Sequence, residues 1–156
     1  MTTCNYIHLV DSKFISIKGE DRKDFLQDLI TNDINKCIEG NPIYSCFLSP
    51  QGKFLADFFI INLGDSYLIE INEIFIENFI AKLNIYKLRS KINISIEENY
   101  TSIVILNTDL KLKIDINNIK FTDPRCSNLG QKIIINSNLI NNFITNNSLI
   151  KVDNKS

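Results

Sequence analysis

The sequence predicts an α+β protein made of antiparallel sheets with packed helices. Segments that alternate apolar and polar residues, the period of a strand, are interspersed with segments of helical period. Turn signals join several neighbouring strands as hairpins, which favours α+β over a doubly wound α/β architecture. The 156 residues suffice for one medium domain or two small ones with a sizeable core.

The first predicted strand, KFISIK at residues 13–18, is ended by Gly19. Glu20 and Asp21 then begin a helix, because acidic side chains are favourable at a helix N-terminus. The apolar face of this helix consists of Phe25, Leu26, Leu29 and Ile30. The segment TNDIN at 31–35 ends the pattern, since Asn and Asp bond to their own backbone in turns.

A hairpin follows, with strands at 42–48 and 53–63. Its turn, SPQG at 49–52, has Ser, Pro and Gly at the positions that a type I turn favours. A Gly-Asp turn then leads into a third strand at 67–71. The sequence therefore predicts three consecutive antiparallel strands.

The second helix is predicted to begin after Asn72, a favourable capping residue, with Glu73 in its first turn. Its apolar stripe consists of Ile76, Phe79, Ile80 and Leu83. The basic segment YKLRSK at 86–91 closes the helix, where cations are favourable. Strands are expected at 91–96, which alternates, and at 102–106, which is continuously apolar.

After Asn107 the patterns weaken. Strands at 119–125 and 130–135 are expected to flank a Pro-containing loop. A short helix is indicated by Leu139, Ile140, Phe143 and Ile144. The polar end of the chain, residues 151–156, is expected to be a frayed tail.

Composition argues against several classes of function. A net charge of −1, with 17 basic and 18 acidic residues, gives no basic excess for direct binding of nucleic acid. Four cysteines without a C-x-x-C pair, and one histidine, His8, near an expected flexible start, predict neither a metal site nor a catalytic base. No apolar run is long enough to span a membrane, and the start does not resemble a secretory signal. We expect a cytoplasmic protein with free thiols.

Asp57 is unusual because it interrupts the long apolar strand at 53–63. A buried carboxylate is costly unless it is paired or binds something. Its strand face also carries Leu55, Phe59 and Ile61, which predicts half burial. Two explanations remain open for Asp57: an ion pair with a neighbouring Lys or Arg, or a binding role. Ordinary structural explanations, as turn, helix-end or loop residues, are available for Asn32, Asp33, Arg89 and Arg125.

Four segments in one linear order resemble the folate-binding YgfZ-type proteins. These segments are GEDRKDFLQ at 19–27, TND at 31–33, PQGKFLADF at 50–58 and YKLRSKINI at 86–94, and a fifth, TDPRCSNLG at 122–130, resembles the family's middle region. The family is related to the aminomethyltransferase, or T-protein, of glycine cleavage. Any one of these motifs is weak, whereas their shared order over most of the chain is fairly specific.

The resemblance implies the N-terminal part of a multi-domain ring whose central channel holds a tetrahydrofolate. Members of the family help iron–sulfur proteins, including tRNA-modifying enzymes, to acquire or keep their clusters, and are not established as catalysts. The resemblance thus implies a folate-binding accessory protein with iron–sulfur client proteins and no catalytic residue. It divides the chain into a folate-binding-like region at 1–107, an incomplete middle region at 108–150 and the tail at 151–156.

By the same resemblance, the hairpin that carries Asp57 lies near the folate channel. A carboxylate accepts hydrogen bonds from the amino group and ring N–H of a pterin. Asn32 and Asp33 are expected nearby, and Tyr86 and Arg89 are expected to contact the ring or the anionic glutamate tail.

The chain also departs from the family. Members are usually much longer and carry a K-G-C-Y-x-G-Q-E segment that is absent here, and Cys126 does not match its cysteine. Two alternatives therefore stay open: an aminomethyltransferase of the glycine-cleavage type, and a non-catalytic remnant or half of a split protein completed by a C-terminal chain. The T-protein usually has a second acid beside Asp57, where this chain has Ala56.

Overall fold

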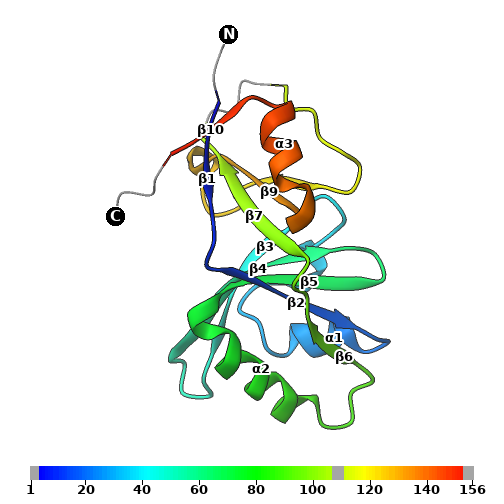
Figure 1. Cartoon of the computed structure of the whole chain (residues 1–156). Coiled ribbons are helices and arrows are strands. Elements are labelled where there is room, and N and C mark those ends of the chain that lie inside the picture. Colours follow the sequence, from blue (N-terminus) through cyan, green and yellow to red (C-terminus); the bar gives the residue numbers. More distant parts are fainter. Residues whose placement is uncertain (1–3, 107–110, 153–156) are drawn as a thin grey trace. The chain divides into compact units, whose positions relative to one another are not determined.

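Two five-stranded sheets dominate the computed structural model, which describes residues 4–106 and 111–152 (Figure 1). They belong to two compact units. Unit 2 contains residues 11–98, and unit 1 contains the described residues of 1–10 and 99–156. The α+β class, with antiparallel sheets and few helices, is confirmed, although one strand pair among the described residues is parallel.

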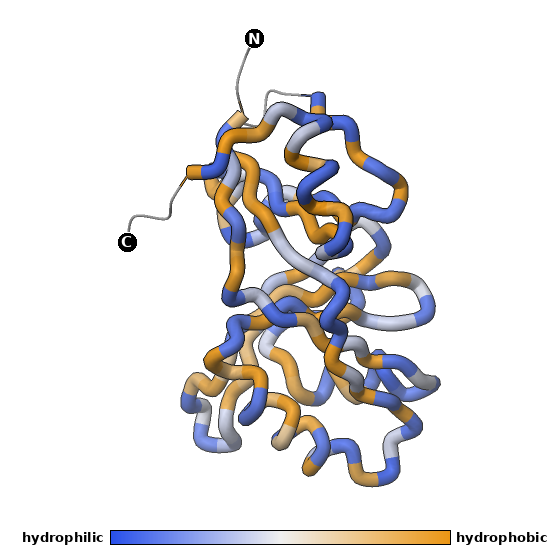
Figure 2. The backbone as a smooth tube through the Cα atoms, in the orientation of Figure 1, coloured by the Kyte–Doolittle hydropathy of each residue, from blue (hydrophilic) through white to orange (hydrophobic). Residues whose placement is uncertain are grey.

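The sheet of unit 2 is antiparallel throughout, in the order β3-β4-β5-β2-β6. Its strands are β2 (Ser12–Lys18), β3 (Ile43–Leu48), β4 (Phe54–Asn62), β5 (Ser66–Asn72) and β6 (Asn93–Ile96). These strands confirm the predicted hairpin and its third strand. Their apolar runs are visible along the chain in Figure 2.

The SPQG turn forms as predicted between β3 and β4. The N–H of Gly52 donates to the carbonyl of Ser49 at 2.8 Å, and the Ser49 hydroxyl accepts from the N–H groups of Gln51 and Lys53. Gly52 has a φ of +78°, a conformation that glycine adopts without steric cost. The turn therefore sets the pairing of β3 with β4, which shifts by one residue between Phe47 and Leu48.

The helix α1 (Arg22–Gln27) is shorter than the sequence predicts. The carbonyl of Leu26 accepts from the N–H groups of both Leu29 and Ile30. The bond to Leu29 is of the tighter 3-10 type, and the α-helix ends there. Leu29 and Ile30 still pack on the core, which explains their helical spacing in the sequence. A 3-10 turn, η1 (Ile34–Lys36), follows before β3.

The helix α2 (Glu73–Lys87) covers one face of the unit 2 sheet. It begins as predicted, because the Asn72 side chain accepts from the N–H of Ile74 at 3.0 Å. Phe79 of α2 is buried against the sheet, and its ring centroid lies 4.9 Å from that of Phe58 and 5.5 Å from that of Phe47. Each such buried side chain contributes about 1.5–3 kcal/mol of transfer free energy.

Unit 1 joins distant parts of the chain in the order β10-β1-β7-β9-β8. Its strands are β1 (Cys4–His8), β7 (Tyr100–Ile105), β8 (Ile119–Thr122), β9 (Gln131–Asn136) and β10 (Leu149–Lys151). The helix α3 (Ile140–Asn146) packs Phe143 into the core, and the 3-10 turns η2 (Ser127–Leu129) and η3 (Ser137–Leu139) flank β9.

The two ends of unit 1 differ from the sequence expectation. The expected flexible start is β1, which pairs antiparallel with β7 and parallel with β10. Lys151 lies in β10 and the N–H of Val152 donates to the carbonyl of Tyr6, whereas residues 153–156 of the expected tail lie outside the described residues. The compact units do not follow the family-based division at residue 107, because β1 and β7 pair with strands that come after that residue. The division at residue 107 stays a prediction.

None of the helices in the described part of the chain is long and apolar enough to cross a membrane.

Candidate functional site

Asp57 lies on the face of the unit 2 sheet that points away from α2. Its neighbours Ala56 and Phe58 alternate with it along β4, and both are buried in the core on the α2 side. Asp57 itself is half-buried, as the sequence predicts, and stands opposite Cys46 of β3.

Tyr44 of β3 is the partner of Asp57. Its hydroxyl donates to Oδ2 of Asp57 at 2.5 Å, and its ring lies 5.4 Å from the ring of Phe59 at an interplanar angle of 56°. A hydroxyl bound to a carboxylate makes a short, charge-assisted hydrogen bond that orients both groups. The ion pairs within residues 4–106 and 111–152 do not include Asp57, so the Lys or Arg pairing considered for it is not what this structure shows.

Sequence reasoning missed Tyr44, although the hairpin contains the signal. Cys46 pairs directly with Asp57, so Tyr44, two residues earlier on β3, is a diagonal cross-strand neighbour on the same face. Diagonal neighbours are within reach of an aromatic side chain. The sequence alone does not show that Tyr44 and Asp57 are diagonal neighbours. Their relation depends on the register of β3 against β4, which shifts by one residue between Phe47 and Leu48.

Asn32 and Asp33 form the turn that leads towards β3. The Asn32 side chain donates from Nδ2 to the carbonyl of Tyr44 at 2.9 Å and accepts the N–H of Asp33 at Oδ1. Asp33 accepts from the backbone and side-chain N–H groups of Asn35, both at 2.9 Å, and these bonds lower its pKa from the ordinary value. Both residues therefore act as turn formers, and Asn32 also holds the strand that carries Tyr44.

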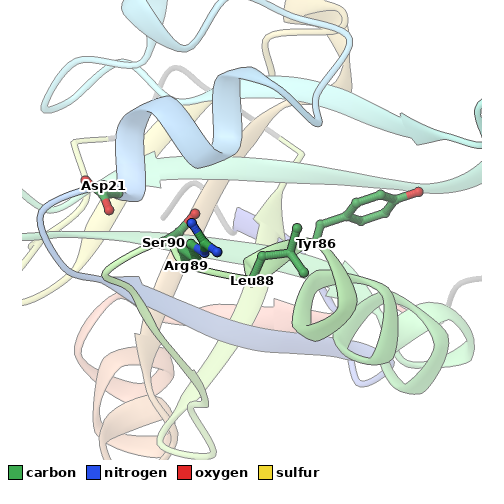
Figure 3. Close-up of a pocket in the computed structure, with 5 residues that line it drawn as sticks. All are labelled: Asp21, Tyr86, Leu88, Arg89 and Ser90. Carbon is green, nitrogen blue, oxygen red and sulfur yellow. The ribbon is translucent and has the colours of Figure 1, made fainter.

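Tyr86 and Arg89 lie together at the C-terminal end of α2, where a hollow of about 690 Å³ is lined by Asp21, Tyr86, Leu88, Arg89 and Ser90 (Figure 3). The Tyr86 ring stands 6.2 Å from that of Phe47, a core residue on the α2 side of the sheet. The structure thus brings Asn32 and Asp57 together through Tyr44, and Tyr86 together with Arg89. The two groups occupy opposite faces of the sheet.

The surroundings of Asp57 fit the polar edge of a pterin. Tyr44 engages Oδ2, and no other hydrogen bond within the described residues reaches the carboxylate, so Oδ1 is available to accept. A pterin offers an amino group and a ring N–H as adjacent donors, and the half-buried ring of Tyr44, which packs against buried Phe59, lies beside the carboxylate. A metal fits less well, because no group of three His, Cys, Asp or Glu residues gathers within the described ranges.

Among the cysteines and the histidine, only half-buried Cys46 stands beside Asp57. All four cysteines are free; burial raises the pKa of Cys37 to about 11, which keeps this thiol protonated and inert at neutral pH. His8 is half-buried in β1, where its Nε2 lies 2.7 Å from the hydroxyl oxygen of Thr101. Burial and the nearby Lys151 charge lower the pKa of His8.

A buried carboxylate also occurs in unit 1, within the TDPR segment. Asp123 accepts from the backbone N–H of Arg125 at 2.9 Å and from its guanidinium at 2.7 and 3.0 Å. Burial alone would raise the pKa of Asp123, but these hydrogen bonds and the charges of Arg125 and Lys132 outweigh it and hold the pKa below its ordinary value. This pair closes the turn after β8 and explains Arg125 as a structural residue.

Comparison with known proteins identifies the family of the chain. A family model described as the GCVT N-terminal domain matches residues 6–107. The chain is 29% identical over 160 residues to the iron-sulfur cluster assembly factor IBA57 homolog, mitochondrial, of Neurospora crassa, which covers 90% of this chain and 36% of that protein. The homolog of Mycosarcoma maydis is 25% identical and covers 79% of this chain and 34% of its own length. The chain thus spans about a third of the length of these relatives.

Among solved structures, the fold is similar to that of the glycine cleavage system aminomethyltransferase T from Bartonella henselae. The TM-score is 0.75, and the match covers 97% of this chain and 48% of that one. At 13% identity this likeness shows the fold alone. The predicted resemblance is confirmed at the level of the family: the chain is related to the IBA57 iron–sulfur cluster assembly factors and belongs to the GCVT N-terminal domain family.

Proposed function

We propose that this chain binds a tetrahydrofolate through Asp57 and serves the assembly or maintenance of iron–sulfur clusters in client proteins. The observation that carries the proposal is its 29% identity, over 90% of its length, to a protein named as an iron–sulfur cluster assembly factor. The family fold and the Asp57–Tyr44 pair support the folate part. As the chain matches about a third of those relatives, their activity as whole proteins is part of the proposal.

In this proposal Asp57 accepts from the amino group and ring N–H of the pterin. Tyr44 is a positioning residue, because its hydroxyl fixes the orientation of the carboxylate. Asn32 supports Tyr44 through its strand, and Asp33 supports Asn32 through the turn. The contact of Tyr86 and Arg89 with the glutamate tail stays a prediction, and their place on the opposite face makes it separable from the role of Asp57.

Calorimetric titration of the full chain with tetrahydrofolate, kept free of oxygen, tests the folate part. We expect saturable binding that weakens roughly 10- to 100-fold in Asp57→Asn, since a hydrogen bond to a charged group contributes about 1.5–3 kcal/mol. Asp65→Asn is the matched control, because Asp65 is exposed in the turn between β4 and β5. Equal affinity of the wild type and Asp57→Asn would remove Asp57 from the site.

The Tyr44→Phe variant tests whether the Tyr44 hydroxyl acts on folate binding by positioning the Asp57 carboxylate. We expect it to weaken folate binding less than Asp57→Asn does, and to have no further effect in the Asp57→Asn background, since the hydroxyl acts through the carboxylate. Additive losses in the double variant would show that Tyr44 acts independently. Arg89→Gln, measured with mono- and polyglutamated folates, tests the tail contact: the loss must grow with the number of glutamates.

The iron–sulfur part is tested in cells that lack their own assembly factor and have low activity of cluster-containing enzymes. If the proposal holds, the chain raises that activity and the Asp57→Asn variant does not. A chain that folds and binds folate, yet leaves the enzymes unrepaired, would separate the two parts and refute the cluster role for this chain acting alone.

A further inference from the structure

The residues before α1 hold the segment that follows α2. Asp21 is the N-cap of α1, yet its side chain makes no capping hydrogen bond to that helix. Its Oδ2 instead accepts the N–H of Lys91, 70 residues later in the chain, at 2.7 Å. Glu20 also pairs with the Lys91 ammonium at 3.0 Å, but this ion pair is weak because both side chains are mostly exposed. We call residues 88–91 the strap.

Gly19 allows the strap to come this close to the start of α1. Its φ is +119°, which glycine adopts without steric cost, and a Cβ at this position would overlap the carbonyl oxygen of Lys91. Gly19 begins the family motif at 19–27, and the strap lies within the motif at 86–94. These two motifs, which are far apart in the sequence, therefore form one local structure.

The strap is under backbone strain at its other end. Leu88 has a φ of +38° and a ψ of −105°, a conformation that costs free energy for a residue with a Cβ and persists only when its surroundings hold it. Leu88 is 87% exposed, so burial of its side chain does not hold it. Instead, the N–H of Ser90 donates to the carbonyl of Lys87 at 2.7 Å. The strap is thus fixed by α2 at one end and by Asp21 at the other.

Arg89 lies in the strap, between the strained residue and the anchored one. It lines the hollow at the end of α2 together with Tyr86 and Ser90 (Figure 3). The ion pairs within residues 4–106 and 111–152 do not include Arg89, so its guanidinium is available to an anion. A cation whose backbone is already fixed loses less conformational entropy when it binds.

We propose that Asp21 is a positioning residue: by holding the strap, it places Arg89 to bind the anionic glutamate tail of a folate. This inference rests on the proposed function, from which it takes the tail as the anion. Asp21 acts through its hydrogen bond to Lys91 and not through its charge, which by itself repels an anion. Loss of this bond lets Leu88 relax, and Arg89 then moves with the strap.

Calorimetric titration of the full chain with three oxygen-protected ligands tests this inference. The ligands are tetrahydropteroate, which has no glutamate, and tetrahydrofolates with one and with five glutamates. In the wild type we expect the affinity to rise with the number of glutamates. We expect Asp21→Ala to bind the pentaglutamate about 3- to 10-fold more weakly and tetrahydropteroate equally well, because only the tail meets Arg89. The Asp21→Ala variant should keep α1, since Asp21 makes no capping bond to it.

Two further variants separate the hydrogen bond of Asp21 from its charge. Asp21→Asn keeps an oxygen that accepts the N–H of Lys91, so we expect it to retain the wild-type dependence on glutamates. Asp24→Ala is the matched control, because it removes an exposed carboxylate that lines an adjoining hollow and has no printed role in holding Lys91. In the Arg89→Gln background, Asp21→Ala should have no further effect, since Asp21 acts through Arg89.

The possible outcomes distinguish this inference from the proposed function. If none of the three ligands binds, both are wrong. If all three bind the wild type equally, the pterin contact stands and this inference is overturned. It is also overturned if Asp21→Asn or Asp24→Ala loses as much affinity for the pentaglutamate as Asp21→Ala does. Trypsin, which cleaves after Arg89, gives a measurement without folate: we expect faster cleavage there in Asp21→Ala, and a rate equal to the wild type would show that Asp21 does not hold the strap.

Discussion

Units 1 and 2 each pack helix on a five-stranded sheet, yet they assemble that sheet from the chain in different ways. In unit 2 the strands β3, β4 and β5 follow one another as hairpin neighbours. In unit 1, β1 lies between β7 and β10, which are separated from it by most of the chain. Local pairing leaves periodic patterns in the sequence, whereas the pairing of distant short segments does not.

The cores of the two units differ too. Unit 2 gathers the rings of Phe47, Phe58 and Phe79 around α2. The core of unit 1 consists mainly of isoleucines from β7 and β9, with Phe143 from α3. Each unit also contains a buried cysteine, Cys37 in unit 2 and Cys4 in unit 1, so thiol labelling reports separately on the opening of each.

The largest effect is expected for Phe58→Ala, which removes the ring at the centre of the unit 2 core. Phe58 is 2% exposed, so the loss is about 3–5 kcal/mol of unfolding free energy. Chemical denaturation measures the loss, and faster alkylation of Cys37 than of Cys4 assigns it to unit 2. Phe54→Ala on the same strand is the control, since Phe54 is mostly exposed; an equal loss there would contradict this account of the core.

A smaller effect is expected for Leu149→Ala in β10, about 2–3 kcal/mol, because Leu149 is buried but lies on an edge strand. Here the alkylation rate of Cys4, which pairs with Leu149 across the sheet, should rise more than that of Cys37. Ile150→Ala, on the exposed side of β10, should leave both rates nearly unchanged. A larger rise at Cys37 would mean that β10 does not belong to the cooperative core of unit 1.

The smallest effect is expected for Asp123→Asn, about 1 kcal/mol at pH 7, because the Arg125 side chain that pairs with Asp123 is 41% exposed. The folded-state pKa of Asp123 lies below its ordinary value, so its contribution is present above the unfolded pKa and is lost as the pH falls through the folded pKa. Thermal unfolding of both forms should therefore differ at pH 7, and the difference should begin to shrink below about pH 4 and vanish as the pH falls through the folded pKa. A constant difference across this range would exclude the ionised carboxylate as its cause.

The contrast between local strand pairing in unit 2 and long-range pairing in unit 1 also explains which strands the sequence predicts. β4 and β5 are predicted to within two residues at each end, because alternation and turn chemistry agree along them. β1 and β10 are absent from the prediction, because they are short and gain their stability from each other and from β7. The predicted first helix extends too far, because Leu29 and Ile30 keep helical spacing while packing from a turn.

The candidate site shows a related limit. Half burial of Asp57 follows from alternation along one strand, which is local. Its hydrogen bond to Tyr44 depends on the register of β3 against β4, and the separation of Tyr86 from Asp57 depends on which face of the sheet α2 covers. The order of residues along the chain shows neither the strand register nor the face of the sheet that a helix covers. Residues that are close in the motifs of a family can therefore lie on opposite faces of a sheet.

The parallel pairing of β1 with β10 has a consequence for synthesis of the protein. Residues 11–98 contain every strand of their own sheet, so unit 2 is able to fold while the rest of the chain is still on the ribosome. β1 is translated before unit 2, but its neighbours β7 and β10 emerge after it. Until then the apolar residues of β1 lack these two strands as partners. β1 is thus made before every strand of unit 2 and paired after them, and a nascent-chain chaperone would find it exposed throughout that interval.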